Sequence, residues 1–172
     1  MLYLKMYGSD LMTVAYIFTT ILSILALVLY FILIKKRNIF NICLFITIIE
    51  INFGYLVLSR AINIESAIFL NIVSYLGAAF LPVYLLFSVF DACNIKVKKL
   101  FKIVLIVISS CAFLVSTTQA WTNLYYTNVT LVIENGYSKL VKEYGPLHLV
   151  YHIYIYIYDR NYINIGLYLH KI

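Results

Sequence analysis

Long apolar runs separated by short polar intervals make up most of the chain. Five runs carry few or no charged residues, and we expect each to be a helix, over residues 11–34, 39–58, 66–90, 100–120 and 147–158. Because a helix rises about 1.5 Å per residue, each of the first four can cross a bilayer core of about 30 Å. The pattern therefore predicts an all-α membrane protein, a bundle of transmembrane helices.

Residues 121–146 form the one sizeable polar interval, and their pattern favours a β-hairpin. Asn135-Gly136 tolerates the positive φ angles of a type I′ turn. β-branched and aromatic residues lie on both sides of this dipeptide, as is common in strands. A solvated loop that only links two helices is the alternative. We therefore predict a small hairpin between the fourth and fifth helices.

The composition is that of an integral membrane protein. Hydrophobic residues make up 64% of the chain and charged residues 12%. Soluble domains carry about 25% charged residues. The formal net charge of +6 does not indicate nucleic-acid binding, because the sequence has no basic helix with interleaved aromatic residues. The lipid bilayer is therefore the partner that the composition predicts.

The positive charges indicate how the chain is oriented. Cations cluster at residues 35–37 and 96–102, after the first and third helices. The intervals after the second and fourth helices have a weaker excess of cations. Cytoplasmic loops are enriched in Lys and Arg, so we expect both clusters in the cytoplasm. The N-terminus and the hairpin are then extracytoplasmic.

The cysteines and histidines predict no metal site and no other cofactor. Cys43, Cys93 and Cys111 fall in or beside apolar runs, and their number and spacing give no disulfide framework. His148 and His152 are four residues apart and share one face of a helix. A third ligand is not evident nearby, and two ligands rarely suffice for a structural metal.

Two polar residues lie deep in the second apolar run. Glu50 and Asn52 are candidates for a ligand, ion or signalling contact, because ionisable groups in membrane helices are costly and usually functional. A hydrogen bond that only packs helices together is the equal alternative. Trp121 and Asn123, at the start of the polar interval, are further candidates for ligand or signalling contacts.

The third apolar run contains Gly77 and Pro82, which predict close helix packing and a kink. Proline removes one backbone donor and its ring clashes with the preceding turn. The kink is a hinge candidate, although many proline kinks in membrane helices are static.

The fifth apolar run is short. Asp159-Arg160-Asn161 follows after about twelve residues, whereas a spanning helix needs about 20. Residues 159–172 form a mixed, atypical tail without a helical stripe. We therefore expect an unfinished fifth helix and a chain that is truncated or frameshifted near Tyr158. A natural short form is the alternative.

Three stretches carry a family resemblance. YLGAAFLPVYLLF at residues 75–87 resembles the third helix of the N-terminal seven-transmembrane sensor region of bacterial histidine kinases. TNLY at residues 122–125 and YGPLH at residues 144–148 resemble motifs after its fourth helix and before its fifth. The resemblance implies that residues 1–158 are part of a seven-helix sensor region.

The resemblance also implies a function and a location. It implies a membrane-embedded sensory input region in the bacterial inner membrane, followed in this family by a kinase, cyclase or PAS output domain. The 172 residues carry no kinase or cyclase motif, so we expect no enzyme activity from them. A homodimer or a membrane partner would complete the bundle, and the sequence does not name the stimulus.

Two other functions stay open at this point. A fragment of a transporter or channel would show a repeated half with paired broken helices, and only one span contains proline. A membrane-embedded enzyme would need His, Asp or Ser groups converging on one side of the bilayer.

Overall fold

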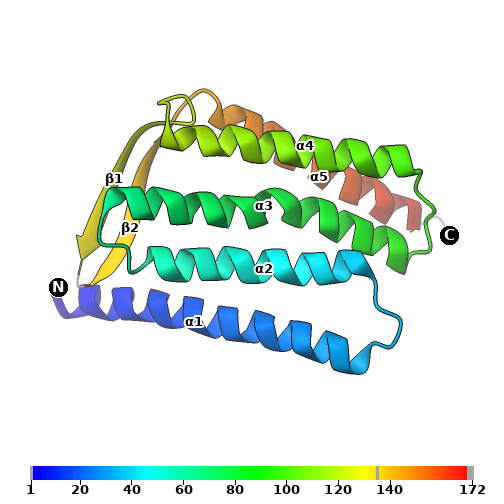
Figure 1. Cartoon of the computed structure of the whole chain (residues 1–172), viewed down its shortest axis with the longest axis horizontal. Coiled ribbons are helices and arrows are strands. Elements are labelled where there is room, and N and C mark those ends of the chain that lie inside the picture. The colour runs from blue at the N-terminus through cyan, green and yellow to red at the C-terminus, as the bar shows by residue number, and fades with distance from the viewer. Residues whose placement is uncertain (1, 135, 170–172) are drawn as a thin grey trace.

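A row of helices with a hairpin across one end forms the fold (Figure 1). The computed structural model describes residues 2–134 and 136–169, with side chains described for residues 11–134, 136–158 and 160. In chain order the elements are α1 (Leu2–Leu33), α2 (Ile39–Leu58), α3 (Ile64–Ala92), α4 (Lys99–Thr117), a 3₁₀ turn η1 (Thr118–Ala120), β1 (Tyr126–Glu134), β2 (Tyr137–Tyr144) and α5 (His148–Leu169).

Among the described residues, four helices are long and apolar enough to cross a membrane, as the sequence predicted. Their spans are Leu11–Leu33, Ile39–Leu58, Ile64–Ala92 and Lys99–Ala120. Asparagine caps fix two of the starts: Asn38 accepts a hydrogen bond from the Phe40 amide, and Asn63 accepts one from the Ser66 amide. Such caps satisfy backbone donors that the first helical turn leaves free.

Several helix boundaries differ by one to three residues from those that the sequence predicted, and two differ by more. α1 begins at Leu2, within the stretch that precedes the first apolar run. α5 continues beyond Tyr158 to Leu169. Polar residues can end an apolar run without interrupting the backbone hydrogen bonds of the helix. Hydropathy alone therefore predicts helices that are too short. Residues 170–172 of the expected tail lie outside the described residues.

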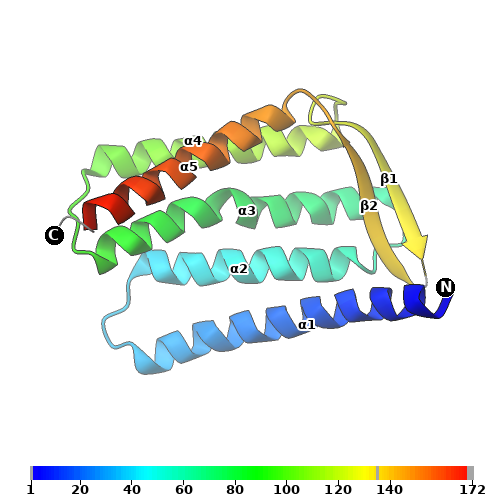
Figure 2. The ribbon, with the colours of Figure 1, turned by 180° about the vertical axis from the view of Figure 1, so that it is seen from behind.

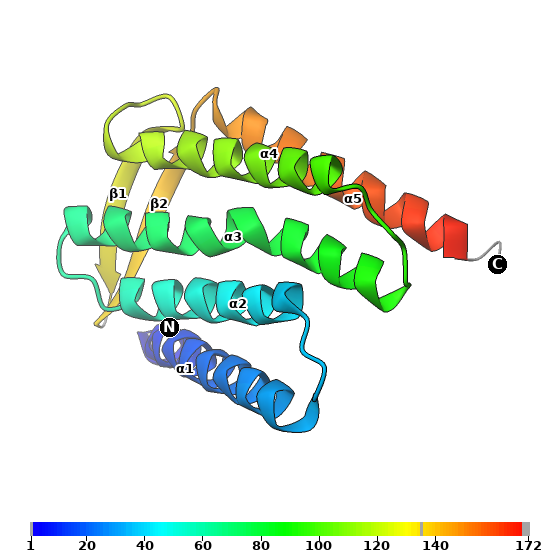
Figure 3. The same ribbon diagram turned by 45° about the vertical axis from the view of Figure 1, so that its right-hand side comes forward.

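α3 lies at the centre of the arrangement. It contacts α2, α4 and α5 as well as η1 and both strands. α1 packs on the far side of α2, and α5 lies along α4 (Figures 2 and 3). The α1–α2 and α3–α4 connections lie at the end of the bundle opposite the hairpin (Figure 1). The first cation cluster lies in the α1–α2 connection, and the second spans the end of the α3–α4 connection and the start of α4.

Small residues bring α2 and α3 close together. A Cβ atom added at Gly77 would lie 2.7 Å from both the Thr47 carbonyl oxygen and Ile51 Cγ1. One added at Gly54 would collide with the Ser74 hydroxyl. Close approach through small residues is a common way for membrane helices to associate. The close packing predicted for Gly77 is therefore confirmed, while its role as a hinge with Pro82 stays a prediction.

Tyrosine hydroxyls attach α5 to α3 and α4. Tyr154 donates to the Ala79 carbonyl oxygen, in the turn of α3 that precedes Pro82. Tyr158 donates to the Leu105 carbonyl oxygen at 3.0 Å, and both hydroxyls lie within 3.3 Å of Ser109 Oγ. The apolar parts of this core come from α3 and α4: Val83, Leu86, Phe87, Leu105 and Ala112.

The hairpin has the two-residue connection that Asn135-Gly136 predicted. β1 and β2 are antiparallel, and Glu134 pairs with Tyr137 across the turn. Gly136 has a φ of 75°, which glycine adopts without strain, while Asn135 lies outside the described residues. Ser138 donates from its amide to the Ser59 carbonyl oxygen at 2.8 Å, which holds the hairpin tip against the end of α2.

Replacement of Gly77 by leucine is expected to destabilise the α2–α3 pair. The new side chain meets backbone and a β-branched neighbour, and such overpacking costs about 1–3 kcal/mol. Thermal unfolding in detergent micelles measures the effect. The control is Cys111→Leu, which enlarges an exposed side chain on α4. Equal unfolding midpoints for the two variants would contradict the close approach of the helices.

Replacement of Tyr154 by phenylalanine is expected to weaken the attachment of α5. The change leaves the buried Ala79 carbonyl oxygen without this donor and buried Ser109 without one of its hydrogen-bond partners, at a cost of about 1–3 kcal/mol. Tyr156 on the same helix is 60% exposed, so Tyr156→Phe serves as the matched control. Amide hydrogen exchange of α5 is expected to accelerate in the first variant and to stay at its original rate in the second.

Candidate functional site

A polar cluster lies where the hairpin crosses α3. We call it the hairpin junction and define it as Asn71 and Tyr75 of α3, Gln119 of η1, Tyr126 of β1 and Lys142 of β2. Lys142 Nζ donates to Asn71 Oδ1 at 2.7 Å, and Asn71 Nδ2 donates to Gln119 Oε1 at 2.6 Å. The hydroxyls of Tyr75 and Tyr126 lie 2.6 Å apart. Three separate parts of the chain are thus joined to one another through α3.

Lys142 reaches this cluster because of the alternation of β2. Ser138, Leu140 and Lys142 face the helices, whereas Lys139, Val141 and Glu143 are exposed. The Lys142 ammonium lies 5.8 Å from the centroid of the Tyr75 ring and 5.4 Å from that of Tyr126, within the range of cation–π attraction. Burial lowers the pKa of Lys142 from 10.5 to about 8.

Aromatic rings surround the junction. Tyr125 and Tyr126 are buried, and their rings lie 4.8 Å apart. Burial, and then the charge of Tyr75, raise the pKa of both hydroxyls. Both rings pack inward between the hairpin and α3, where that of Tyr125 meets the ring of Tyr75.

The two histidines lie beside these rings. His148 stacks on Tyr144 at 4.0 Å between ring centroids, and the rings of His148 and His152 are 4.6 Å apart. In the part of the chain that the structure describes, no group of three His, Cys, Asp or Glu side chains has the geometry to hold a metal ion. The contacts that are seen for His148 are aromatic packing.

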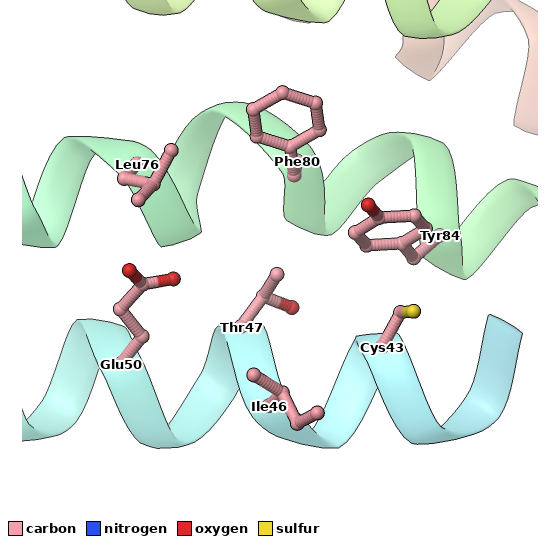
Figure 4. Close-up of a pocket in the computed structure, with 7 residues that line it drawn as sticks. All are labelled: Cys43, Ile46, Thr47, Glu50, Leu76, Phe80 and Tyr84. Carbon is pink, nitrogen blue, oxygen red and sulfur yellow. The ribbon is translucent and has the colours of Figure 1, made fainter. Parts of the chain in front are cut away.

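A second site is a groove in the membrane-spanning part of α2 and α3 (Figure 4). It has a volume of about 240 Å³ and is open on one side. α2 contributes four residues spaced along one face, and α3 contributes three: Cys43, Ile46, Thr47, Glu50, Leu76, Phe80 and Tyr84. Glu50 lies at one end of the groove and points toward α3 beside Leu76 (Figure 4).

The four candidate residues from the sequence do not converge. Glu50 lines the groove, whereas the Asn52 amide donates to the Ile48 carbonyl oxygen of its own helix at 2.9 Å. Trp121 is 79% exposed, and Asn123 is also exposed. The roles proposed for these residues stay predictions. Of the four, Glu50 lines a described groove with space for a ligand.

Sequence reasoning missed the residues that form the hairpin junction. Asn71 is an amide residue in the apolar stretch FLNIVSYLG, whereas the intramembrane candidates from the sequence were Glu50 and Asn52. The alternation of Ser138, Leu140 and Lys142 was a usable signal, because it places the lysine on the face with a serine and a leucine. The partners of these side chains lie far away in the sequence.

The lowered pKa predicts that the hairpin junction becomes more stable as the pH rises. Between about pH 8 and pH 10.5 the Lys142 amine is protonated in the unfolded chain and neutral in the folded chain, so the free energy of unfolding increases with pH. Below about pH 8 the amine is charged in both states, and the folded state bears the full free-energy cost of burying that charge. Thermal unfolding between pH 7 and 9.5 should show this slope, and Lys142→Met should remove it. Lys139→Met, which removes an exposed ammonium from the same strand, should retain it.

The comparison with known families agrees with this architecture. No curated protein and no solved structure matches the chain. The family model described as the N-terminal 7TM region of histidine kinase matches residues 11–159, which is most of the 172 residues. This family is a sensor input region and not a catalytic domain. With four helices that can span a membrane, this multi-pass membrane chain belongs to the family of N-terminal seven-transmembrane regions of histidine kinases.

Proposed function

We propose that the chain is the sensory input region of a histidine-kinase-type protein and that α3 carries the signal. The observation that supports this role is the hairpin junction. Lys142 and Asn71 connect the hairpin to α3, and Asn71 also connects α3 to η1 through Gln119. A displacement of the hairpin therefore acts directly on the helix that contacts α2, α4 and α5.

The signal would be a change in the population of two packings. A stimulus shifts such an equilibrium only by as much as its affinities for the two states differ. Sliding or tilting of packed helices is a common way to transmit such a shift. The two ends of α3 are well placed for this, because one contacts the hairpin and the other precedes the connection to α4 at the opposite end of the bundle (Figure 1).

We place the hairpin and the N-terminus outside the bacterial inner membrane. The support is the shared position of the two cation clusters at the end opposite the hairpin (Figure 1). Lys- and Arg-rich loops are retained in the cytoplasm. The proposed path then runs from an external or intramembrane stimulus to the cytoplasmic ends of α3 and α4.

The output would be provided outside the membrane bundle. The 172 residues carry no kinase or cyclase motif, so an output domain elsewhere in the polypeptide or on a membrane partner would receive the signal. A homodimer is one arrangement that fits this role.

Disruption of the hairpin junction is expected to change the output of a receptor in which this region precedes a kinase domain. Lys142→Met and Asn71→Leu each break a connection between the hairpin and α3. A coupling of about 1–3 kcal/mol corresponds to a change of about 5–150-fold in the signalling equilibrium. Autophosphorylation in inside-out membrane vesicles measures that equilibrium, and Lys139→Met is the control.

Two results would count against the sensory function. One is an unchanged autophosphorylation level and dose response in both junction variants, with normal amounts of folded protein in the membrane. The other is solute flux through the chain in proteoliposomes, which would favour a transporter or channel.

A further inference from the structure

Glu50 is an ionisable group near the middle of a membrane-spanning helix. At about 1.5 Å per residue it lies about 16 Å along α2 from Ile39 and about 12 Å from Leu58. No hydrogen bond or ion pair joins its carboxylate to another of the described residues. An intramembrane carboxylate without a partner is costly, and such groups usually face a cavity or a ligand pathway.

The groove beside Glu50 supplies that space. Its volume of about 240 Å³ exceeds the approximately 150 Å³ of an engineered apolar cavity that binds benzene. Apart from Glu50, its lining is mainly aliphatic and aromatic, with Phe80 and Tyr84 along α3. The hydroxyls of Thr47 and Tyr84 and the thiol of Cys43 are its other polar groups. The groove is thus suited to a small molecule with an apolar body and one polar end.

Charge complementarity decides the nature of that polar end. A carboxylate accepts hydrogen bonds and attracts cations, and it repels an anionic headgroup. Aromatic rings attract ammonium groups through their faces, so Phe80 and Tyr84 favour the same sign of charge. A neutral lipid chain would fill the apolar part and leave the carboxylate unpaired.

We propose that the groove between α2 and α3 binds a small lipophilic amine, with its ammonium group on Glu50 and its apolar body against Phe80. The position gives the ligand a direct effect on helix packing. Gly77 lies against Thr47 and Ile51, where α2 and α3 approach closely next to the groove. A ligand in the groove therefore stabilises one spacing of the two helices over another.

The biological role of this ligand rests on the proposed sensory function. Its binding can be tested without any measurement of signalling. The 172-residue chain is placed in lipid nanodiscs with Cys93 and Cys111 replaced by serine. Cys43, which lines the groove, is then the cysteine that N-ethylmaleimide can alkylate. The probes are 4-phenylbutylamine, the neutral 4-phenylbutanol and the anionic 4-phenylbutyrate, which share one apolar body.

We expect 4-phenylbutylamine to slow the alkylation of Cys43, with an apparent affinity about tenfold higher than that of the alcohol. The butyrate is expected to give no protection. Glu50→Gln should abolish the preference for the amine over the alcohol, and Glu50→Asp should retain part of it. Glu65→Gln, which removes an exposed carboxylate in the first turn of α3, should leave the preference unchanged.

Two outcomes would overturn the assignment. The first is equal protection by the amine and the alcohol in the unmodified groove. The second is a preference for the amine that persists in Glu50→Gln. Cys43 of this variant must then be alkylated at the original rate in the absence of any probe, which shows that the groove is intact. Either outcome concerns the ligand alone. The sensory function would fail separately, through an unchanged kinase output in the hairpin-junction variants.

Discussion

Polar groups in apolar surroundings need partners, and in this fold α3 is where most of those partners meet. Asn71 is fully buried and is satisfied by Gln119 from η1 and Lys142 from β2. Further along the helix, the Ala79 carbonyl oxygen accepts a hydrogen bond from Tyr154 of α5. Removal of one partner costs more free energy than the hydrogen bond contributes to stability, because the other polar group stays buried without a partner. This asymmetry holds the hairpin, η1 and α5 in their places around α3.

The hairpin junction combines a cost with a gain in specificity. Burial of the Lys142 ammonium disfavours its charged form, and an amide oxygen with two aromatic rings offsets only part of that cost. A leucine at this position would fill the same space at lower cost. The lysine instead selects one register of the hairpin on α3, since only that register places Asn71 beneath it. An interaction so balanced is suited to respond to a stimulus, because small changes shift it.

The Glu50 groove and the hairpin junction act on the same helix from different depths. The junction contacts α3 near its N-terminal end, and the groove follows its middle turns. Gly77, where α2 and α3 approach closely, lies beside Leu76 at the start of the groove. An external stimulus at the hairpin and a lipophilic ligand in the groove would therefore bias one common element, the spacing of α2 and α3. The two inputs would then be coupled, because each would shift the same equilibrium between helix spacings.

The sequence by itself determined the features that depend on local or one-dimensional properties. Hydropathy gave the four spanning helices, the cation clusters pointed to one shared end, and Asn135-Gly136 placed the hairpin connection, because length, charge and turn conformation need no distant partner. Motifs near Gly77 and Pro82 also indicated the family. Only the tertiary structure decided that Tyr125 and Tyr126 pack inward, that α5 continues past Tyr158, and that Asn71 meets Lys142 across 71 positions. Those outcomes depend on which faces of the helices and strands become neighbours after folding. The spacing of apolar and polar residues along the sequence does not contain that information.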